Sequence, residues 1–307
     1  MNLLITGAWQ NAGANLERIR NMGHCVAFLQ QEKDPLPCEP AWVEGVICNG
    51  LFLDHPIENF PNLKYIQLTS AGYDRVPMEY IRRNDITIRN ARGVYSIPMA
   101  EYALGGVLEL YKQFSGFREN QRNHLWEKRR NLLELAGKTV CIVGCGSVGG
   151  ECAKRFSAFG CRVIGIATSR REQPFFREVR EEAALDGALA EADVVVLTVP
   201  LTEKTHHLMN AERFAAIRRG AILVNIARGA VVDTRALEQA LKQNHLAGAV
   251  LDVFEEDPLD LPVKIAAYYG LRRSEVLGLK WDAIDFEKKT VTIRHTVTQM
   301  CMDGKST

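Results

Sequence analysis

The glycine run between residues 144 and 149 points most directly to chemistry. It follows the apolar run Thr139–Val143 and leads into a helical pattern. In that setting the first glycine permits a tight turn, the second lets the backbone approach a pyrophosphate, and the third allows close packing of helix and strand. The free N–H groups at the helix start then bind the anion. An ordinary strand-to-helix turn is the alternative. The residues predicted to bind a dinucleotide here are Gly144, Gly146, Ser147, Val148 and Gly149.

The next strand, expected at Arg162–Ala167, ends without the acidic residue that would favour NAD. A carboxylate at that point accepts hydrogen bonds from the ribose 2′-hydroxyl of NAD. The sequence has Thr168, Ser169 and Arg170 instead, and their hydroxyl and guanidinium groups suit a 2′-phosphate. We predict NADP or NAD as the cofactor, with NADP favoured; the alternative is that these residues form a solvated, charged turn.

Short apolar runs alternate with helical patterns along most of the chain, which predicts an α/β fold of two doubly wound parallel-sheet domains. A long amphipathic stretch from Pro98 to about Trp126, predicted to be one helix, connects them. A helix at Thr234–Gln243 is expected to begin on a threonine cap. The expected strands are Leu3–Thr6, Cys25–Leu29, Gly45–Cys48, Tyr65–Leu68, Ile86–Arg89, Thr139–Val143, Arg162–Ala167, Asp193–Val199, Ala221–Ile226 and Ala247–Val253.

The composition is that of a soluble globular protein, with 47% hydrophobic and 24% charged residues. A net charge of +1 indicates neither a nucleic-acid nor a membrane partner. The eight cysteines show no metal-binding spacing, so we expect no metal site, reduced thiols and a cytoplasmic location. The N-terminus has no signal-peptide pattern, and we expect no membrane span.

Several separated blocks carry a resemblance to a known family. They are Thr69–Asp74, Ala100-Glu101, the glycine loop, Val199–Thr202, Asn225–Ala230 and Gly248–Glu255. In these blocks, residues 1–263 resemble the D-isomer-specific 2-hydroxyacid dehydrogenases. The resemblance implies a flavodoxin-like substrate domain at residues 1–95 and a Rossmann NAD(P)-binding domain at 96–263. It also implies hydride transfer between a nicotinamide and a small 2-keto or D-2-hydroxy acid, and a homodimer formed through about Pro98–Glu134.

The resemblance assigns roles to individual residues. Arg228 matches the arginine that grips the substrate carboxylate and polarises the carbonyl, a task suited to its planar fork; capping of a strand end is the alternative. Asp257 stands where the family usually has the glutamate that orients a proton-donating histidine. The implied cofactor pocket includes Val199, Pro200, Thr205, Ile226, Ala227, Arg228 and Asp252, and the implied substrate site includes Ser70, Ala71, Gly72 and Tyr95.

The histidine itself does not follow Asp257 in the family's Thr-Pro-His block. The only later histidine, His295, has neighbours of a different pattern, and His206 and His207 are expected to have surface roles. Without a general acid, the chemistry is expected to slow by about two to four orders of magnitude. The alternative function is an inactive remnant that still binds the dinucleotide.

Residues 264–307 have a different texture, with a helix expected at Lys264–Leu279 and a strand at Thr290–Ile293. The run Tyr269–Phe286 resembles the start of the catalytic domain of phage-type tyrosine recombinases, with Arg272 matching a phosphate-binding arginine and Glu275 its helix partner. We therefore expect a short foreign α+β tail. The chain reaches Thr307 before a tyrosine nucleophile appears, so DNA binding or strand exchange is only a third hypothesis and no nucleic-acid partner is expected.

Overall fold

The computed structural model describes residues 1–9, 12–170 and 172–255, together with four two-residue strands further along the chain. The chain forms two compact units, Met1–Asp252 and Val253–Thr307. In the second unit, β12 (Ile284–Asp285) pairs with β13 (Thr290–Val291), and β14 (Cys301–Met302) pairs with β15 (Lys305–Ser306), both antiparallel. Asp257 and the helix expected at Lys264–Leu279 lie outside the described residues, as does the end of the strand expected at Thr290–Ile293.

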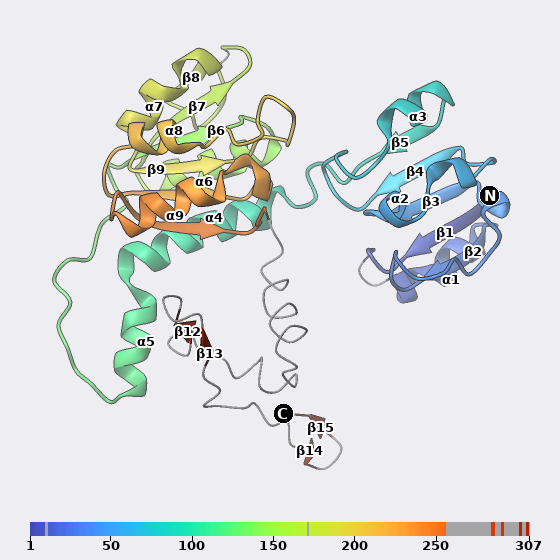
Figure 1. Cartoon of the computed structure of the whole chain (residues 1–307), viewed down its shortest axis with the longest axis horizontal. Coiled ribbons are helices and arrows are strands. Elements are labelled where there is room, and N and C mark those ends of the chain that lie inside the picture. Colours follow the sequence, from blue (N-terminus) through green and yellow to red (C-terminus); the bar gives the residue numbers. More distant parts are fainter. Residues whose placement is uncertain are drawn as a thin grey trace. The chain divides into compact units, whose positions relative to one another are not determined.

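The first sheet belongs to the N-terminal part of the first unit (Figure 1). Its elements are β1 (Asn2–Thr6), α1 (Ala12–Asn21), β2 (Cys25–Leu29), β3 (Gly45–Cys48), α2 (Leu51–Asp54), β4 (Tyr65–Leu68), α3 (Met78–Arg83) and β5 (Thr87–Arg89). The strands are parallel, in the order β2-β1-β3-β4-β5. This is the flavodoxin-like order. Leu4, Val46, Ile66, Leu68 and Phe60 form the centre of its apolar core.

A second, six-stranded sheet follows. Its elements are α4 (Ser96–Lys112), α5 (Phe114–Arg122), β6 (Thr139–Val143), α6 (Ser147–Ala158), β7 (Arg162–Ala167), β8 (Glu178–Glu181), α7 (Leu185–Glu191), β9 (Val194–Leu197), α8 (Ala211–Ala216), β10 (Ala221–Asn225), α9 (Thr234–Lys242) and β11 (Leu246–Leu251). All strand pairs are parallel, in the order β11-β10-β9-β6-β7-β8. The chain order reverses between β6 and β9, so this is the switch point at which dinucleotides bind in Rossmann domains.

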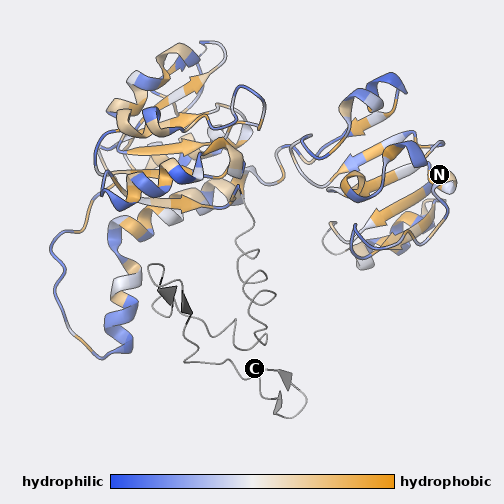
Figure 2. Cartoon of the chain, in the orientation of Figure 1, coloured by the Kyte–Doolittle hydropathy of each residue, from blue (hydrophilic) through white to orange (hydrophobic). Residues whose placement is uncertain are grey.

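The two faces of the second sheet bury separate apolar cores. Successive side chains of a strand point to opposite faces. Val140 and Ile142 of β6 pack with α4 and α6, whereas Cys141 and Val143 pack with α7, α8 and α9. Figure 2 shows the apolar colour along these strands. Burial on both faces confirms the doubly wound architecture predicted from the sequence, whereas the domain limits at residues 95 and 263 stay predictions.

The helix predicted over Pro98–Trp126 is wrong as a single element. The backbone breaks at Gln113, whose φ of 52° and ψ of 44° place it in the left-handed region, and α5 ends at Arg122. Non-glycine residues adopt this conformation rarely. Because no glycine or proline marks the break, the apolar pattern alone did not locate it.

Two smaller expectations are also corrected. The cap of α9 is Asp233, whose carboxylate accepts hydrogen bonds from the N–H groups of Arg235 and Ala236, and not Thr234. Strand β8 was not predicted, because its sequence Glu-Val-Arg-Glu is mostly charged and lacks the apolar pattern of a buried strand. It is an edge strand in which only Val179 is buried. None of the helices within the described ranges has both the length and the apolar character that a membrane crossing requires.

Candidate active site

Only glycine fits at two of the three key positions of the glycine loop. Gly144 has a φ of +102°, and its N–H donates to the carbonyl of Ile166 at 2.9 Å. A Cβ at Gly149 would lie 2.1 Å from the Gly144 carbonyl oxygen, so the third glycine lets α6 pack against the loop. A Cβ at Gly146 would meet no atom within 4 Å. The loop is therefore open at Gly146, directly before the helix start.

The open space suits a pyrophosphate. Gly146 and Ser147 are exposed, and the first N–H groups of the 12-residue α6 have no carbonyl partner within the helix. They and the positive end of the helix dipole attract an anion. The residues present thus fit the phosphates of a dinucleotide, with Ser147 and Val148 at the helix start as predicted.

The end of β9 forms the other side of the switch point. The Thr198 hydroxyl lies 2.6 Å from the carbonyl oxygen of Gly144, to which it donates. The following turn is closed by Thr205, whose hydroxyl donates to the carbonyl of Pro200 at 2.6 Å and accepts from the N–H of Thr202 at 2.8 Å. Thr205 therefore shapes the turn that carries Val199 and Pro200.

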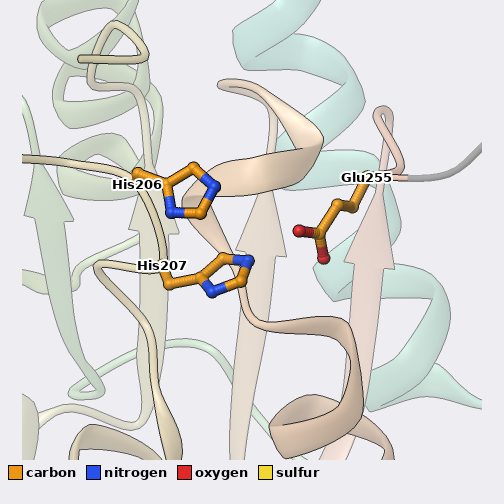
Figure 3. Close-up of side chains that lie close together, drawn as sticks. All are labelled: His206, His207 and Glu255. Carbon is orange, nitrogen blue, oxygen red and sulfur yellow. The ribbon is translucent and has the colours of Figure 1, made fainter. Parts of the chain in front are cut away.

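The same turn ends at two histidines (Figure 3). The rings of His206 and His207 stack with their centroids 4.1 Å apart, and the N–H of His207 donates to Ala230 at 2.8 Å. His206 is exposed and His207 is half-buried. Glu255, also labelled in Figure 3, belongs to the second compact unit.

Asn225, at the end of β10, organises the turn that carries Arg228. Its buried amide donates to the carbonyl of Arg228 at 3.0 Å and accepts from the N–H of Ala227 at 3.1 Å. Its own carbonyl accepts from the N–H of Asp252 at 3.0 Å. The turn thus brings together three predicted residues, Ala227, Arg228 and Asp252. Asn225 was not among the predicted site residues, although a polar residue at the end of a buried strand was a usable signal.

Arg228 is held by three hydrogen bonds. Its Nη1 donates to the carbonyl of Ala227 at 2.8 Å, while Nε and Nη2 donate to the two carboxylate oxygens of Asp74 at 3.3 and 3.1 Å. Burial raises the pKa of the Asp74 carboxyl, but the hydrogen bonds and charge of Arg228 outweigh this effect and leave that pKa below its ordinary value. Asp74 is therefore a charged partner of Arg228 at neutral pH, a contact not predicted from the sequence.

The turn Ser70–Gly72 lies against the same arginine. The carbonyl of Ala71 accepts from the Asn90 amide at 2.7 Å, and that of Ser70 accepts from the N–H of Ala91 at 2.9 Å. A Cβ at Gly72 would lie 2.2 Å from Nη2 of Arg228. Of the four predicted substrate residues, Gly72 thus adjoins Arg228, and Ser70 and Ala71 precede it in the same turn. Tyr95, 41% exposed just before α4, has no hydrogen bond to this turn among the described contacts.

The region after β7 carries no carboxylate at the position that selects NAD. Thr168, Ser169 and Arg170 are exposed. Arg170 lines a cavity of about 310 Å³ together with the carboxylates of Glu172 and Glu178, and with Gln173, Phe176, Arg177 and Val179. Its lining runs from Arg170, just after β7, to the first residues of β8.

A parallel sheet of this order, with an open glycine loop at its switch point, defines a Rossmann dinucleotide-binding domain. Residues 104–268 match the family described as "D-isomer specific 2-hydroxyacid dehydrogenase, NAD binding domain". The chain belongs to this family. The predicted family and its dinucleotide cofactor are confirmed.

Relatives and solved structures agree with this assignment. The chain is 38% identical over 210 residues to a glyoxylate reductase of Pyrococcus horikoshii, a match that covers 66% of this chain and 63% of the relative. A glyoxylate reductase of Thermofilum pendens is 37% identical, with 65% and 60% covered. The chain thus spans less than two thirds of these curated relatives.

Among solved structures, a D-lactate dehydrogenase of Aquifex aeolicus, complexed with NAD and lactic acid, gives a TM-score of 0.75 at 27% identity, with 90% of this chain and 83% of that one covered. A family member from Xanthobacter autotrophicus, in complex with NADPH, gives 0.66 at 29% identity, with 84% and 82% covered.

Proposed function

We propose that this chain reduces a small 2-keto acid, or oxidises the corresponding D-2-hydroxy acid, with a nicotinamide dinucleotide. The observation that carries the proposal is Arg228 beside the Ser70–Gly72 turn. Among the described residues, none accepts a hydrogen bond from the N–H of Ala71 or Gly72. A fixed positive charge and two available N–H groups form a site for a carboxylate next to a polarised carbonyl. Glyoxylate is the first substrate to test, since the relatives are named for it.

In this proposal, different residues of the chain bind the dinucleotide and the substrate. When bound, the dinucleotide supplies or accepts the hydride. The glycine loop and the start of α6 hold its phosphates, with Val199, Pro200, Ile226, Ala227 and Asp252 along its path. Arg228 holds the carboxylate and stabilises negative charge on the carbonyl oxygen.

We also propose that proton transfer is impaired in this chain. The proposal rests on the sequence after Asp257, which contains no Thr-Pro-His block. We expect turnover of glyoxylate, hydroxypyruvate or pyruvate to be slower by about two to four orders of magnitude than with an intact general acid. Added imidazole, a soluble proton donor, is expected to accelerate the reaction. Fast turnover that imidazole leaves unchanged would refute this proposal, and dinucleotide binding without turnover would indicate an inactive remnant.

NADPH is proposed as the preferred cofactor, and we expect it to bind more tightly than NADH. The supporting observation is the exposed Thr168-Ser169-Arg170 segment without an acidic residue. Arg170→Gln is expected to weaken NADPH binding by about tenfold, the effect of losing one charge-assisted hydrogen bond, and to leave NADH binding unchanged. Fluorescence titration of both cofactors measures this effect. Arg219→Gln, at another exposed arginine, is the control; tighter binding of NADH by the unmodified chain would contradict the prediction.

A homodimer is proposed through α4, α5 and the segment up to Glu134. Apolar side chains are exposed along this surface: Phe114 is 49%, Leu125 51% and Trp126 99% exposed. We expect Trp126→Ala to weaken self-association by about thirtyfold, because buried tryptophans at interfaces contribute about 2 kcal/mol or more. Sedimentation equilibrium measures the effect, with Leu53→Ala as the control. A chain that is monomeric at all concentrations would contradict the proposal.

Two further proposals rest on the sequence. Residues 264–307 are proposed to be a recombinase-like fragment, supported by the run Tyr269–Phe286, and a DNA mobility-shift assay is expected to show no saturable tight binding. A cytoplasmic location is proposed because Cys48, Cys141 and Cys152 are buried and form no disulfide, as reducing compartments favour.

A further inference from the structure

Asp74 occupies one particular edge of the Arg228 side chain. A guanidinium has five N–H groups: one on Nε and two on each Nη. Nε and one proton of Nη2 form the side edge, and this edge is bonded to the two oxygens of Asp74 at 3.3 and 3.1 Å. One proton of Nη1 points back to the carbonyl of Ala227 at 2.8 Å.

Two N–H groups remain, one on each Nη, and both lie on the end edge of the guanidinium. No acceptor for them is found among the described residues. The side chain is 32% exposed, so solvent and small ligands reach it. The end edge has the geometry of a bidentate carboxylate site.

Gly72 shows how closely the three groups fit. An ideal Cβ at this position would lie 2.2 Å from both Nη2 of Arg228 and Oδ1 of Asp74. The backbone of the turn therefore passes directly beside the ion pair, and only a residue without a side chain permits this approach. The N–H groups of Ala71 and Gly72, which have no described acceptor, lie in the same turn.

We propose that Asp74 is a positioning residue: its carboxylate fixes the side edge of Arg228 so that the end edge faces the substrate carboxylate. This inference rests on the proposed function. Asp74 does not touch the substrate; it prevents the long, flexible arginine side chain from turning its other edge to the site. A rival role makes Asp74 a competitor that the substrate must displace from Arg228, and the two roles predict opposite effects of its removal.

Oxamate is a suitable probe, because its carboxylate and adjacent carbonyl mimic a 2-keto acid. Its affinity for the complex of the full chain with NADPH can be titrated without turnover. Asp74→Asn retains the shape of the side chain but replaces one acceptor oxygen with an amide donor. The paired hydrogen bonds from Nε and Nη2 of Arg228 are therefore lost. We expect oxamate binding to weaken by about tenfold, with NADPH affinity changed less than twofold. Asp74→Glu, which keeps the charge, is expected to recover part of the affinity, and Asp54→Asn, at an exposed carboxylate of α2, to match the unmodified chain.

A second measurement follows the ion pair itself. In ¹H–¹⁵N spectra of arginine side chains, Nε–H of Arg228 is expected to give a slowly exchanging resonance that disappears in both Arg228→Lys and Asp74→Asn. If Asp74→Asn does not fold, Asp74→Ser replaces it, since the short hydroxyl cannot accept from both Nε and Nη2, and oxamate binding is expected to weaken to the same extent.

The outcomes separate the two proposals. Unchanged or tighter oxamate binding in Asp74→Asn, or no protected Nε–H in the unmodified chain, overturns the positioning role. An unmodified chain that shows the protected Nε–H but neither binds oxamate nor converts any 2-keto acid refutes the proposed function, and the positioning role falls with it.

Discussion

Replacing Arg228 with lysine is expected to lower kcat/KM for a 2-keto acid by about a hundredfold to a thousandfold, the usual effect of removing a preorganised group that stabilises developing oxyanion charge. Lysine keeps the positive charge but carries it as a point on a flexible stem. It cannot bond Asp74, the carbonyl of Ala227 and a bidentate substrate at once, as the guanidinium can. Steady-state kinetics with glyoxylate and NADPH measure the effect, down to the slow rates expected for this chain.

Cofactor affinity is the internal control for this variant. The described side-chain hydrogen bonds of Arg228 go to Ala227 and Asp74. None of them goes to the glycine loop. Fluorescence titration is therefore expected to show a much smaller loss of NADPH affinity than of kcat/KM, since lysine keeps the positive charge at this edge of the implied cofactor pocket. Arg219→Gln removes an exposed arginine of the same domain and is expected to retain full activity. If Arg228→Lys had the same kcat/KM as the unmodified chain, the site for the substrate carboxylate would have to lie elsewhere.

Local spacing explains why the dinucleotide loop was predictable from the sequence. The glycines act on their own strand–loop–helix unit, and the structure places Gly144, Gly146 and Gly149 as the pattern requires. The ten expected strands were equally local, and each differs from the structure by at most one or two residues at an end, where hydrogen bonding gives way to turns. The charged edge strand β8 was missed, because only one of its side chains is buried.

Contacts between distant segments were not predictable in the same way. Asp74 and Arg228 are 154 residues apart, so their pairing depends on two sheets and two turns that no local pattern describes. Asn225 was visible as part of a matching block, yet its function depends on the turn geometry that brings Ala227, Arg228 and Asp252 to it. The break in the helix at Gln113 could not be predicted for a related reason. Gln113 adopts the left-handed conformation, but a glutamine gives no sign of this in the sequence.

The second large effect is expected at Gly146, where an alanine should weaken cofactor binding strongly without destabilising the chain. The backbone at this position, with φ −81° and ψ −159°, is accessible to any residue. A Cβ there would meet nothing within 4 Å. Thermal unfolding of Gly146→Ala is therefore expected to match that of the unmodified chain. The added methyl does, however, occupy the space of the pyrophosphate and separates it from the N–H groups of α6. Since each charge-assisted hydrogen bond contributes about 1.5–3 kcal/mol, NADPH affinity should fall by about tenfold to a hundredfold.

Two neighbouring glycines make this prediction specific. Gly150→Ala adds a methyl that also meets nothing within 4 Å, but inside α6 and one turn beyond the phosphate site. Alanine favours a helix interior by about 0.5–1 kcal/mol over glycine, so this control should keep its cofactor affinity and unfold at the same or a higher temperature. Gly149→Ala places a methyl 2.1 Å from the carbonyl oxygen of Gly144 and should lower both stability and affinity. If Gly146→Ala bound NADPH as tightly as Gly150→Ala, the pyrophosphate could not lie against this loop, and the dinucleotide would have to bind without the anion site at the start of α6.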